Sequence, residues 1–223
     1  GDSENFLGSD ITAFLKYTSR VMFLNDGELC VLTTDSIRVF DKNKKTIKKK
    51  EELITWDIKD AEKSGFPHFM LKEIYDQPDT VHHVLRGRIS EMEETITFPE
   101  PVEKLLSTEI NSIHIVACGT SFYSGVVGKY LIEQLTNIQV STELASEYRY
   151  FGSRNESSLV IAITQSGETA DTLGALREAQ LSGCKTLVVT NVIGSTATRI
   201  ADGYILQQSG PEIGVAATKT FTS

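Results

Sequence analysis

Small polar side chains are concentrated in AITQSGETADTL, residues 162–173, directly after an apolar run. Thr164, Ser166 and Thr169 carry hydroxyls that can donate hydrogen bonds to phosphate oxygens, and Gly167 allows the backbone to approach a ligand closely. If a helix starts in this stretch, its free N-terminal amides and its macrodipole attract the same anion. These residue types in this order are therefore typical of a phosphate-binding loop.

Two further loops carry residues that suit the same ligand. CGTSFYSG, residues 118–125, has a glycine for close backbone approach and three hydroxyl side chains just before a predicted helix. SGPEIGVAATKT, residues 209–220, is a third loop, in which glycine and proline keep the backbone near the site. We expect the three loops to form one binding site.

Helix capping is the alternative explanation for these hydroxyls, because a single Ser or Thr before a helix is usually only an N-cap. Two hydroxyl-rich loops after separate strands of one sheet favour a ligand site instead. Neither of the first two loops contains a lysine, and nothing in the chain matches G-x-x-x-x-G-K-[ST]. A nucleoside triphosphate would require such a lysine and a metal-binding acid. The pattern favours a monoester phosphate on a small neutral molecule.

Cys118 is a candidate nucleophile in the first loop, but a catalytic thiol needs a neighbouring base. The nearest histidine in sequence is His114, on the same face of a predicted strand. Four residues of strand span roughly 13 Å, which is too far for a hydrogen bond. We therefore interpret Cys118 as a packed thiol that lines the pocket.

Strands and helices alternate from residue 113 onward, which predicts an α/β domain with a five-stranded parallel sheet flanked by helices. The expected strands are 113–118, 138–145, 158–164, 185–191 and 203–208, and the expected helices are 122–135, 170–183 and 195–202. Leu173, Leu176 and Leu181 are expected to face the core. In such a sheet, ligands bind beyond the carboxyl ends of the strands, where the three loops lie.

The region before residue 59 has a different pattern. Short segments rich in β-branched residues, 20–26, 28–34 and 36–41, predict an antiparallel piece. The piece is too small for a core of its own, so we expect it to be part of a domain that begins upstream of Gly1. The lysines of residues 43–50 are interpreted as a solvated turn.

Between the two regions, residues 59–67 are charged, contain glycine and proline, and are interpreted as a linker. Residues 68–112 then show helical spacing of apolar residues, and Pro78 is expected to interrupt the helix. His82 and His83 are adjacent, so in a helix they diverge by about 100° and suit a surface pair better than a metal site.

Composition limits the classes of partner. The chain has 223 residues and a formal net charge of −8, from 22 basic and 30 acidic side chains. This balance argues against nucleic acid and against anionic membrane. No apolar run approaches the length of a membrane span, and the first ten residues do not resemble a signal peptide.

The three cysteines are far apart and form no CxxC pair, which favours free thiols, no metal site and a cytoplasmic protein. The chain begins without methionine and ends at AATKTFTS. From its ends we expect it to be a piece of a longer protein.

The motifs HIVACGTSFYSG, ELASEYRY, TQSGETADT and GPEIGVAATKTFT resemble the first sugar-isomerase (SIS) domain of one family. That family is the isomerising glutamine:fructose-6-phosphate amidotransferases, or glucosamine-6-phosphate synthases. ENFLGSD and HFMLKEIYDQP are similar to the end of its glutaminase domain and to its inter-domain region. Each motif occurs in several SIS proteins, but the ordered set is specific.

The resemblance implies that the parent enzyme converts fructose 6-phosphate and glutamine to glucosamine 6-phosphate and glutamate, with no metal or organic cofactor. An N-terminal glutaminase domain would release ammonia, and two SIS domains would use it. The catalytic residues of the parent would lie before Gly1 and after Ser223, so none is assigned here. The family is usually dimeric or larger, and we expect a homodimer or higher oligomer that binds a hexose 6-phosphate.

By motif match, the resemblance also assigns binding residues. The phosphate would be held by Thr164, Gln165, Ser166 and Thr169, and the sugar would be lined by Cys118, Gly119, Thr120 and Ser121, with Val215 from the third loop. Two positions depart from the family pattern. Thr164 replaces a usual serine but keeps the hydroxyl, whereas Ala217 replaces a usual serine and loses it.

The resemblance divides the chain into a partial glutaminase domain (1–58), a linker (59–67), a helical segment that opens the isomerase half (68–112) and the first SIS domain (113–223). Two other functions stay open: a regulatory SIS module that binds a phosphosugar without chemistry, and an SIS-type deglycase. The segment 1–58 argues against both. A regulator would carry a DNA-binding helical segment there, and deglycases lack the glutaminase domain.

Overall fold

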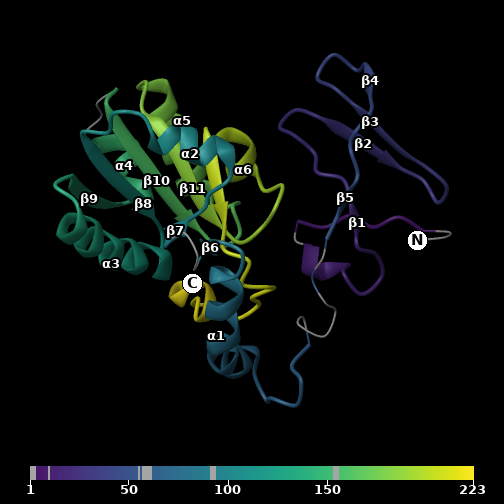
Figure 1. Cartoon of the computed structure of the whole chain (residues 1–223). Coiled ribbons are helices and arrows are strands. Elements are labelled where there is room, and N and C mark those ends of the chain that lie inside the picture. Colours follow the sequence, from purple (N-terminus) through teal and green to yellow (C-terminus); the bar gives the residue numbers. More distant parts are fainter. Residues whose placement is uncertain (1–3, 10, 55, 57–61, 91–93, 153–155) are drawn as a thin grey trace. The chain divides into compact units, whose positions relative to one another are not determined.

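The computed structural model describes residues 4–9, 11–54, 56, 62–90, 94–152 and 156–223. The chain divides into two compact units, Gly1–Gly65 and Phe66–Ser223 (Figure 1). The division falls inside the segment 59–67 that the sequence indicates as a linker, of which residues 59–61 lie outside the described residues.

Short antiparallel strands form the first unit. Its elements are η1 (Ile11–Ala13), β1 (Arg20–Val21), β2 (Leu29–Leu32), β3 (Ile37–Phe40), β4 (Thr46–Ile47) and β5 (Glu52–Leu53). β2, β3 and β4 form one antiparallel sheet, and β1 pairs with β5. β1, β2 and β3 fall within the predicted segments 20–26, 28–34 and 36–41, whereas β4 and β5 were not predicted. Few side chains are buried, among them Leu15, Val21 and Val39, so this unit has a small core.

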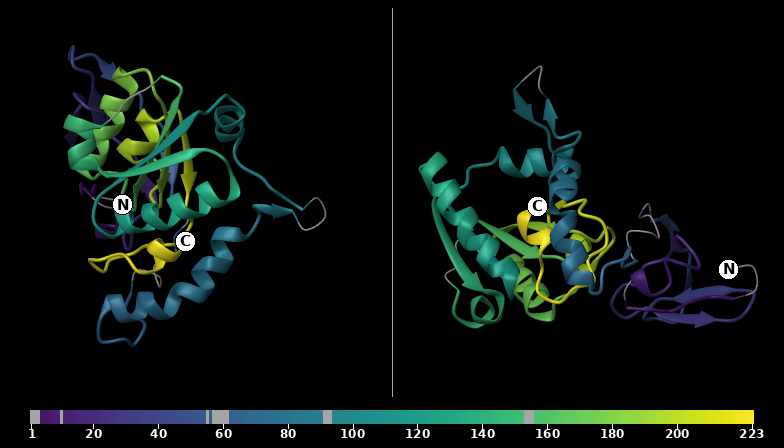
Figure 2. Two further views of the ribbon diagram at one scale, coloured as in Figure 1. Left: turned by 90° about the vertical axis from the view of Figure 1, so that its left-hand side faces the viewer. Right: turned by 90° about the horizontal axis from the view of Figure 1, so that it is seen from below.

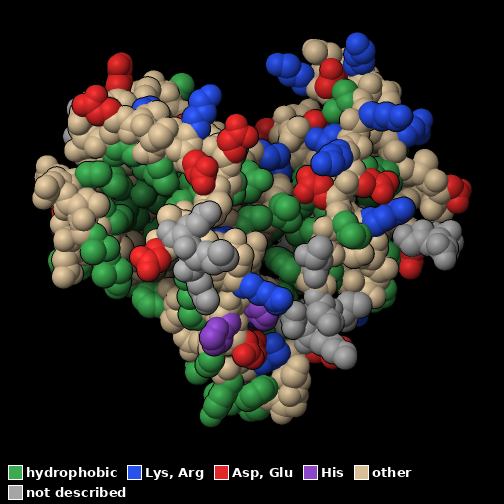
Figure 3. Space-filling model, in the orientation of Figure 1, with side chains coloured by type: hydrophobic (Ala, Val, Ile, Leu, Met, Phe, Trp, Pro, Cys, Tyr) green, Lys and Arg blue, Asp and Glu red, His purple; other side chains and the backbone are tan. Residues whose placement is uncertain are grey.

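The predicted lysine turn is solvated for the most part. Lys44, Lys45 and Lys48 are exposed, and Figure 3 shows lysine and arginine side chains gathered over the β2–β4 sheet. Lys49 differs, because its Nζ lies 2.9 Å from the carboxylate of Glu28 and both side chains are largely covered. The segment 43–50 is therefore polar and mostly exposed, with one ion pair, but it is not a turn throughout, because Thr46–Ile47 form β4 beside β3.

The second unit begins with α1 (Phe69–Leu85), which continues through Pro78. The expected interruption is wrong for a specific reason. Proline has no N–H to donate to the carbonyl of Ile74, one turn earlier. The side-chain amide of Gln77 donates to that oxygen instead, at 2.9 Å. His82 and His83 are exposed on this helix, as predicted for a surface pair.

The segment after α1 is not helical throughout. A two-stranded antiparallel hairpin, β6 (Ile89–Ser90) and β7 (Thr95–Ile96), precedes α2 (Glu100–Leu106). Residues 91–93, between the two strands, lie outside the described residues.

A five-stranded, all-parallel sheet forms the centre of the second unit and confirms the predicted fold class. Its strands are β8 (Ser112–Ala117), β9 (Gln139–Leu144), β10 (Ser158–Thr164), β11 (Lys185–Thr190) and β12 (Gly203–Leu206). Their order across the sheet is β9-β8-β10-β11-β12. The chain changes its direction of winding between β8 and β10, and ligands bind at such switch points beyond the carboxyl ends of the strands.

Helices cover both faces of this sheet (Figures 1 and 2). They are α3 (Thr120–Leu135), α4 (Ala145–Phe151), α5 (Ala170–Leu181) and α6 (Thr196–Ile200), with α7 (Lys219–Thr222) at the end of the chain. α4, α5 and α6 pack on one face, and α2 and α3 pack on the other.

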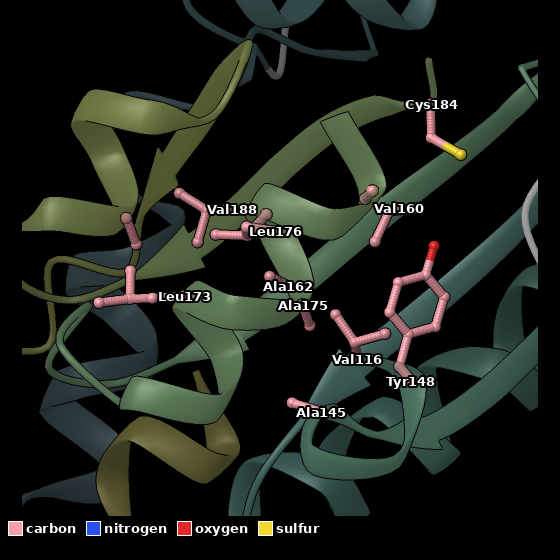
Figure 4. Packing of buried hydrophobic residues seen from close by; sticks show 12 residues of the cluster. Val116, Ala145, Tyr148, Val160, Ala162, Leu173, Ala175, Leu176, Cys184 and Val188 are labelled. Carbon is pink, nitrogen blue, oxygen red and sulfur yellow. The ribbon is translucent and has the colours of Figure 1, made fainter. Parts of the chain in front are cut away.

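Alternate residues of the central strands face the two layers. Val160 and Ala162 of β10 pack with Leu173 and Leu176 of α5 in one core, shown in Figure 4. Leu159 packs in the opposite core. Because both faces are covered, β10 is a continuous apolar run, as the sequence indicated.

Two expectations about the helices need correction. α4 was not predicted: Ala145 was expected to end the strand 138–145, and residues 146–151 were assigned to no element. Leu181 was expected to face the core, but it is 82% exposed. Five residues after Leu176, it lies about 140° further around the helix, away from the sheet.

Candidate functional site

The first two predicted loops meet at the switch point of the sheet. β8 and β10 are parallel neighbours, with Ala117 paired to Ile163, so both strands deliver their loops to the same edge. Residues 118–121 lead from β8 into α3, and residues 164–169 lead from β10 into α5. The sheet topology therefore places the two hydroxyl-rich loops side by side.

The loop 164–169 is closed by its own hydroxyls. Thr164 Oγ1 lies 3.2 Å from Thr169 Oγ1 and accepts the N–H of Gly167 at 3.2 Å. Ser166 Oγ accepts the N–H of Glu168, also at 3.2 Å. Gly167 has φ +69°, a conformation that L side chains rarely adopt. The turn is thus fixed by hydrogen bonds before a ligand is considered.

Residues at the end of β11 and at the start of α6 support this turn from outside. The carbonyl of Gln165 accepts the hydroxyl of Thr190 at 3.2 Å and the N–H of Asn191 at 3.1 Å. The carbonyl of Gly167 accepts the N–H of Ala197 at 3.0 Å, at the start of α6. The loop is therefore attached to β11 and α6 through its backbone carbonyls.

The hydroxyls do not cap the helices that follow them. The N-cap residues are Gly119 for α3 and Thr169 for α5, and neither helix has a side-chain hydrogen bond at its cap. The capping alternative therefore does not explain these loops. The N-terminal amides of two long helices are directed toward the same region, where they favour an anion.

Cys118 and His114 contact different side chains. The hydroxyl of Thr172 donates to Cys118 Sγ at 3.9 Å, so the thiol packs against α5. The Nδ1 atom of His114 lies 2.7 Å from Ser141 Oγ and 3.4 Å from Glu143 Oε1, within the sheet. These contacts agree with the interpretation of Cys118 as a pocket-lining thiol.

The third loop crosses over the pocket from the far edge of the sheet. The N–H of Ala217 donates to Thr120 Oγ1 at 3.2 Å, which joins this loop to the first one. Val215, two residues before Ala217 in the third loop, is 91% exposed. Ala217 lines the pocket with a methyl group. The resemblance implies that a serine is usual at this position, so the hydroxyl of that serine is missing here.

A single cavity of about 560 Å³ lies between the three loops, within the usual size range of small-molecule sites. All nine residues predicted to bind a ligand line it: Cys118, Gly119, Thr120, Ser121, Thr164, Gln165, Ser166, Thr169 and Val215. Thr172 and Glu212 also line it but were not predicted. Thr172 could have been found, because it lies one helical turn after Thr169.

Glu212 is the one charged side chain among the described residues that line the cavity. Its Oε1 accepts the N–H groups of Thr218 at 2.9 Å and Lys219 at 3.0 Å. The carboxylate is therefore occupied by backbone at the start of α7. The helix N-termini and backbone amides at the cavity offer hydrogen-bond donors, which suit a compact anion such as a phosphate.

Across the described ranges, no group of three or more His, Cys, Asp and Glu side chains is arranged to hold a metal ion. In the same part of the chain, no helix is long and apolar enough to cross a membrane.

The sheet order and the three-loop cavity define an α/β protein with a cavity at the switch point of a parallel sheet. The chain belongs to the SIS-domain family, whose family model matches residues 107–223, more than half of its length. Among solved structures, it resembles the C-terminal domain of glucosamine-fructose-6-phosphate aminotransferase from Francisella tularensis. That match has a TM-score of 0.66 and 39% identity, and covers 72% of this chain and 45% of the other.

Curated relatives match the chain from end to end. It is 51% identical to a glutamine–fructose-6-phosphate aminotransferase (isomerizing) of Methanosarcina acetivorans and 43% identical to one of Thermus thermophilus, with 100% of this chain covered in both. The chain spans only 36% and 37% of the lengths of these relatives. The resemblance seen in the motifs is thereby confirmed over the whole chain.

Proposed function

We propose that this chain supplies the phosphosugar-binding domain of an enzyme that converts fructose 6-phosphate and glutamine to glucosamine 6-phosphate and glutamate. The observation that carries the proposal is the convergence of three separate loops on one cavity with two helix N-termini. The relatives named for this reaction, at up to 51% identity, support the choice of ligand.

In this proposal, the two ends of the cavity have different roles. Thr164, Gln165, Ser166 and Thr169 hold the phosphate at the start of α5. Cys118, Gly119, Thr120 and Ser121 line the sugar from the start of α3, and Val215 covers it from the third loop. Hydroxyls and backbone amides suit a phosphate monoester, since they donate hydrogen bonds without a metal ion or a lysine.

In this proposal the residues of the chain bind the sugar phosphate, and none of them takes part in the chemical step. The remaining parts of the enzyme would carry the glutaminase and isomerase residues. We also propose that the whole protein is cytoplasmic, is a homodimer or higher oligomer, and requires no cofactor. The formal net charge of −8 on this chain supports a small-molecule ligand over nucleic acid.

Titration calorimetry of the chain with fructose 6-phosphate and with fructose tests the phosphate assignment. The proposal predicts heat of binding for the phosphorylated sugar only, and competition by inorganic phosphate. Equal affinity for the two sugars, or no binding of either, would overturn it.

An assay of the full-length protein distinguishes the enzyme from a regulatory module or a deglycase. The enzyme forms glucosamine 6-phosphate from fructose 6-phosphate only when glutamine is present. A protein that binds the sugar phosphate but forms no amino sugar would support the regulatory alternative.

A further inference from the structure

A carboxylate from outside the SIS match is bound to the third loop of the pocket. Glu73 belongs to α1, whereas the family model begins at residue 107. Its Oε1 accepts the N–H of Ile213 at 2.6 Å and that of Gly214 at 3.0 Å, and its Oε2 lies 3.1 Å from the same Gly214 nitrogen. Glu73 is only 2% exposed. A buried carboxylate of this kind is stable only when it is well hydrogen-bonded.

Gly214 brings the loop close to the backbone of α1 at this contact. A Cβ atom on Gly214 would lie 3.3 Å from Met70 Cα and would overlap the Glu73 carboxylate. Gly214 therefore allows the backbone to reach the helix. Figure 2 shows the C-terminal segment lying beside α1, in agreement with the contacts between α1 and α7.

The loop is fastened on both sides of its exposed tip. Glu73 holds residues 213 and 214 before Val215. After it, the N–H of Ala217 is bound by Thr120, and the N–H of Thr218 by Glu212. Val215 and its neighbour Ala216 thus extend over the cavity from two fixed ends.

Further charged side chains of α1 and α7 pair with each other near Glu73. Lys72 Nζ lies 2.6 Å from Asp76 Oδ2, and Lys219 Nζ lies 3.6 Å from the same oxygen. Lys72 and Lys219 are buried between α1 and α7. Lys219 is also under the electrostatic influence of Glu73, so the loop anchor lies beside a buried ionic cluster that joins α1 to α7.

We propose that Glu73 is a positioning residue, which holds the third loop over the cavity and so sets the affinity for the sugar phosphate. This inference rests on the proposed function for its ligand. It assigns a role in the site to α1, a helix that does not line the cavity. Without the anchor, Val215 would sample positions away from the ligand, and binding would include the cost of ordering the loop.

Glu73→Gln is the sharpest variant, because it removes the charge but keeps the shape. The Gly214 nitrogen contacts both carboxylate oxygens. Either orientation of a glutamine amide therefore sets an NH2 group against the N–H of Gly214, two donors facing each other. Glu133→Gln is the matched control. Glu133 also binds a backbone N–H, that of Val140 at 3.1 Å, and it lies on α3 outside the cavity lining.

Two measurements on the full chain test the inference: amide hydrogen exchange at Ile213 and Gly214, and the dissociation constant for fructose 6-phosphate. We expect Glu73→Gln to speed exchange and to weaken binding by roughly tenfold, the size of one charged hydrogen bond. Glu133→Gln should change neither. Unchanged exchange and affinity in Glu73→Gln would overturn the inference.

A second variant covers the case in which Glu73→Gln does not fold. Gly214→Ala keeps the buried charge but forces the loop away from the carboxylate, and should produce the same two effects. If the unchanged chain does not bind fructose 6-phosphate, the proposed function fails. The loop anchor is then tested by hydrogen exchange alone. It is refuted if exchange at Ile213 and Gly214 stays slow in both variants.

Discussion

The hydroxyl oxygens of Thr164 and Thr169 lie 3.2 Å apart, one at the end of β10 and the other immediately before α5. This contact closes the strand-to-helix turn on itself, and Thr164 also binds the N–H of Gly167. The hydroxyl and N–H groups of the turn are therefore already held together before a ligand binds. A ligand that binds such a preorganised loop loses less free energy to the ordering of side chains.

Replacement of Thr169 by valine should weaken binding of fructose 6-phosphate, because the hydroxyl is lost while the shape of the side chain is retained. A hydrogen bond to a charged group contributes about 1.5–3 kcal/mol, which corresponds to a loss of roughly ten- to 150-fold in affinity. Titration calorimetry measures this loss. Thr136→Val, at the far end of α3, is the control and should leave the affinity unchanged. Equal affinity in both variants would show that backbone amides suffice.

Much of the site could be predicted from the sequence because the signals are local. The apolar run 158–164 marks a buried strand, and the hydroxyls that follow it mark its carboxyl end. Once the sheet is known to be parallel, the loops 118–121 and 164–169 must lie at the same edge. The nine predicted residues line one cavity for that reason.

The missing parts are contacts between residues that are distant in sequence. Glu73 binds Gly214 across 141 positions, and no periodicity in either segment indicates that pairing. The order of the strands is also set by long-range packing, so the position of the switch point was not predicted. Pro78 shows the limit of local rules, since the neighbouring Gln77 supplies the hydrogen bond that the proline cannot make.

Gly167→Ala should destabilise the chain and disturb the loop. Gly167 has φ +69°, and a Cβ atom there would overlap the side chain of Ser195, which is buried. Backbone strain alone costs about 1–2 kcal/mol, and the overlap adds to it. Urea unfolding measures the change in free energy.

Gly87→Ala is the control for that experiment. Gly87 has φ +77° with open space around it, so its replacement introduces the strain without the overlap. A smaller loss of stability at Gly87 than at Gly167 is expected. Equal losses of stability in the two variants would show that the overlap with Ser195 adds no cost.

The stability of the chain should depend on the charge of Lys219 at alkaline pH. Burial lowers the pKa of Lys219 below its ordinary value of 10.5, although Asp76 partly opposes this. As the pH rises from that lowered pKa to 10.5, the folded chain loses this proton before the unfolded chain does. The contribution of Lys219 to the free energy of unfolding therefore increases over this range.

Lys219→Met removes this proton while it keeps a long side chain, so the comparison isolates the effect. Urea unfolding at several pH values between neutral and 10.5 should show the wild-type chain gaining stability relative to the variant. A difference in stability that stays constant across the range would contradict the prediction.

Two glycines of α3 face the same strand residue and should respond in opposite ways to alanine. A Cβ atom on Gly125 would lie 2.7 Å from Ile115 Cγ2, so Gly125→Ala overpacks the contact between α3 and β8 and should cost about 1–3 kcal/mol. A Cβ atom on Gly128 would lie 3.7 Å from Ile115 Cδ1, an ordinary contact. Gly128→Ala should therefore stabilise the chain by up to about 1 kcal/mol, the gain in helix propensity. Urea unfolding of the two variants in parallel checks the prediction, and a stabilised Gly125→Ala chain would show that α3 moves away from the sheet at little cost.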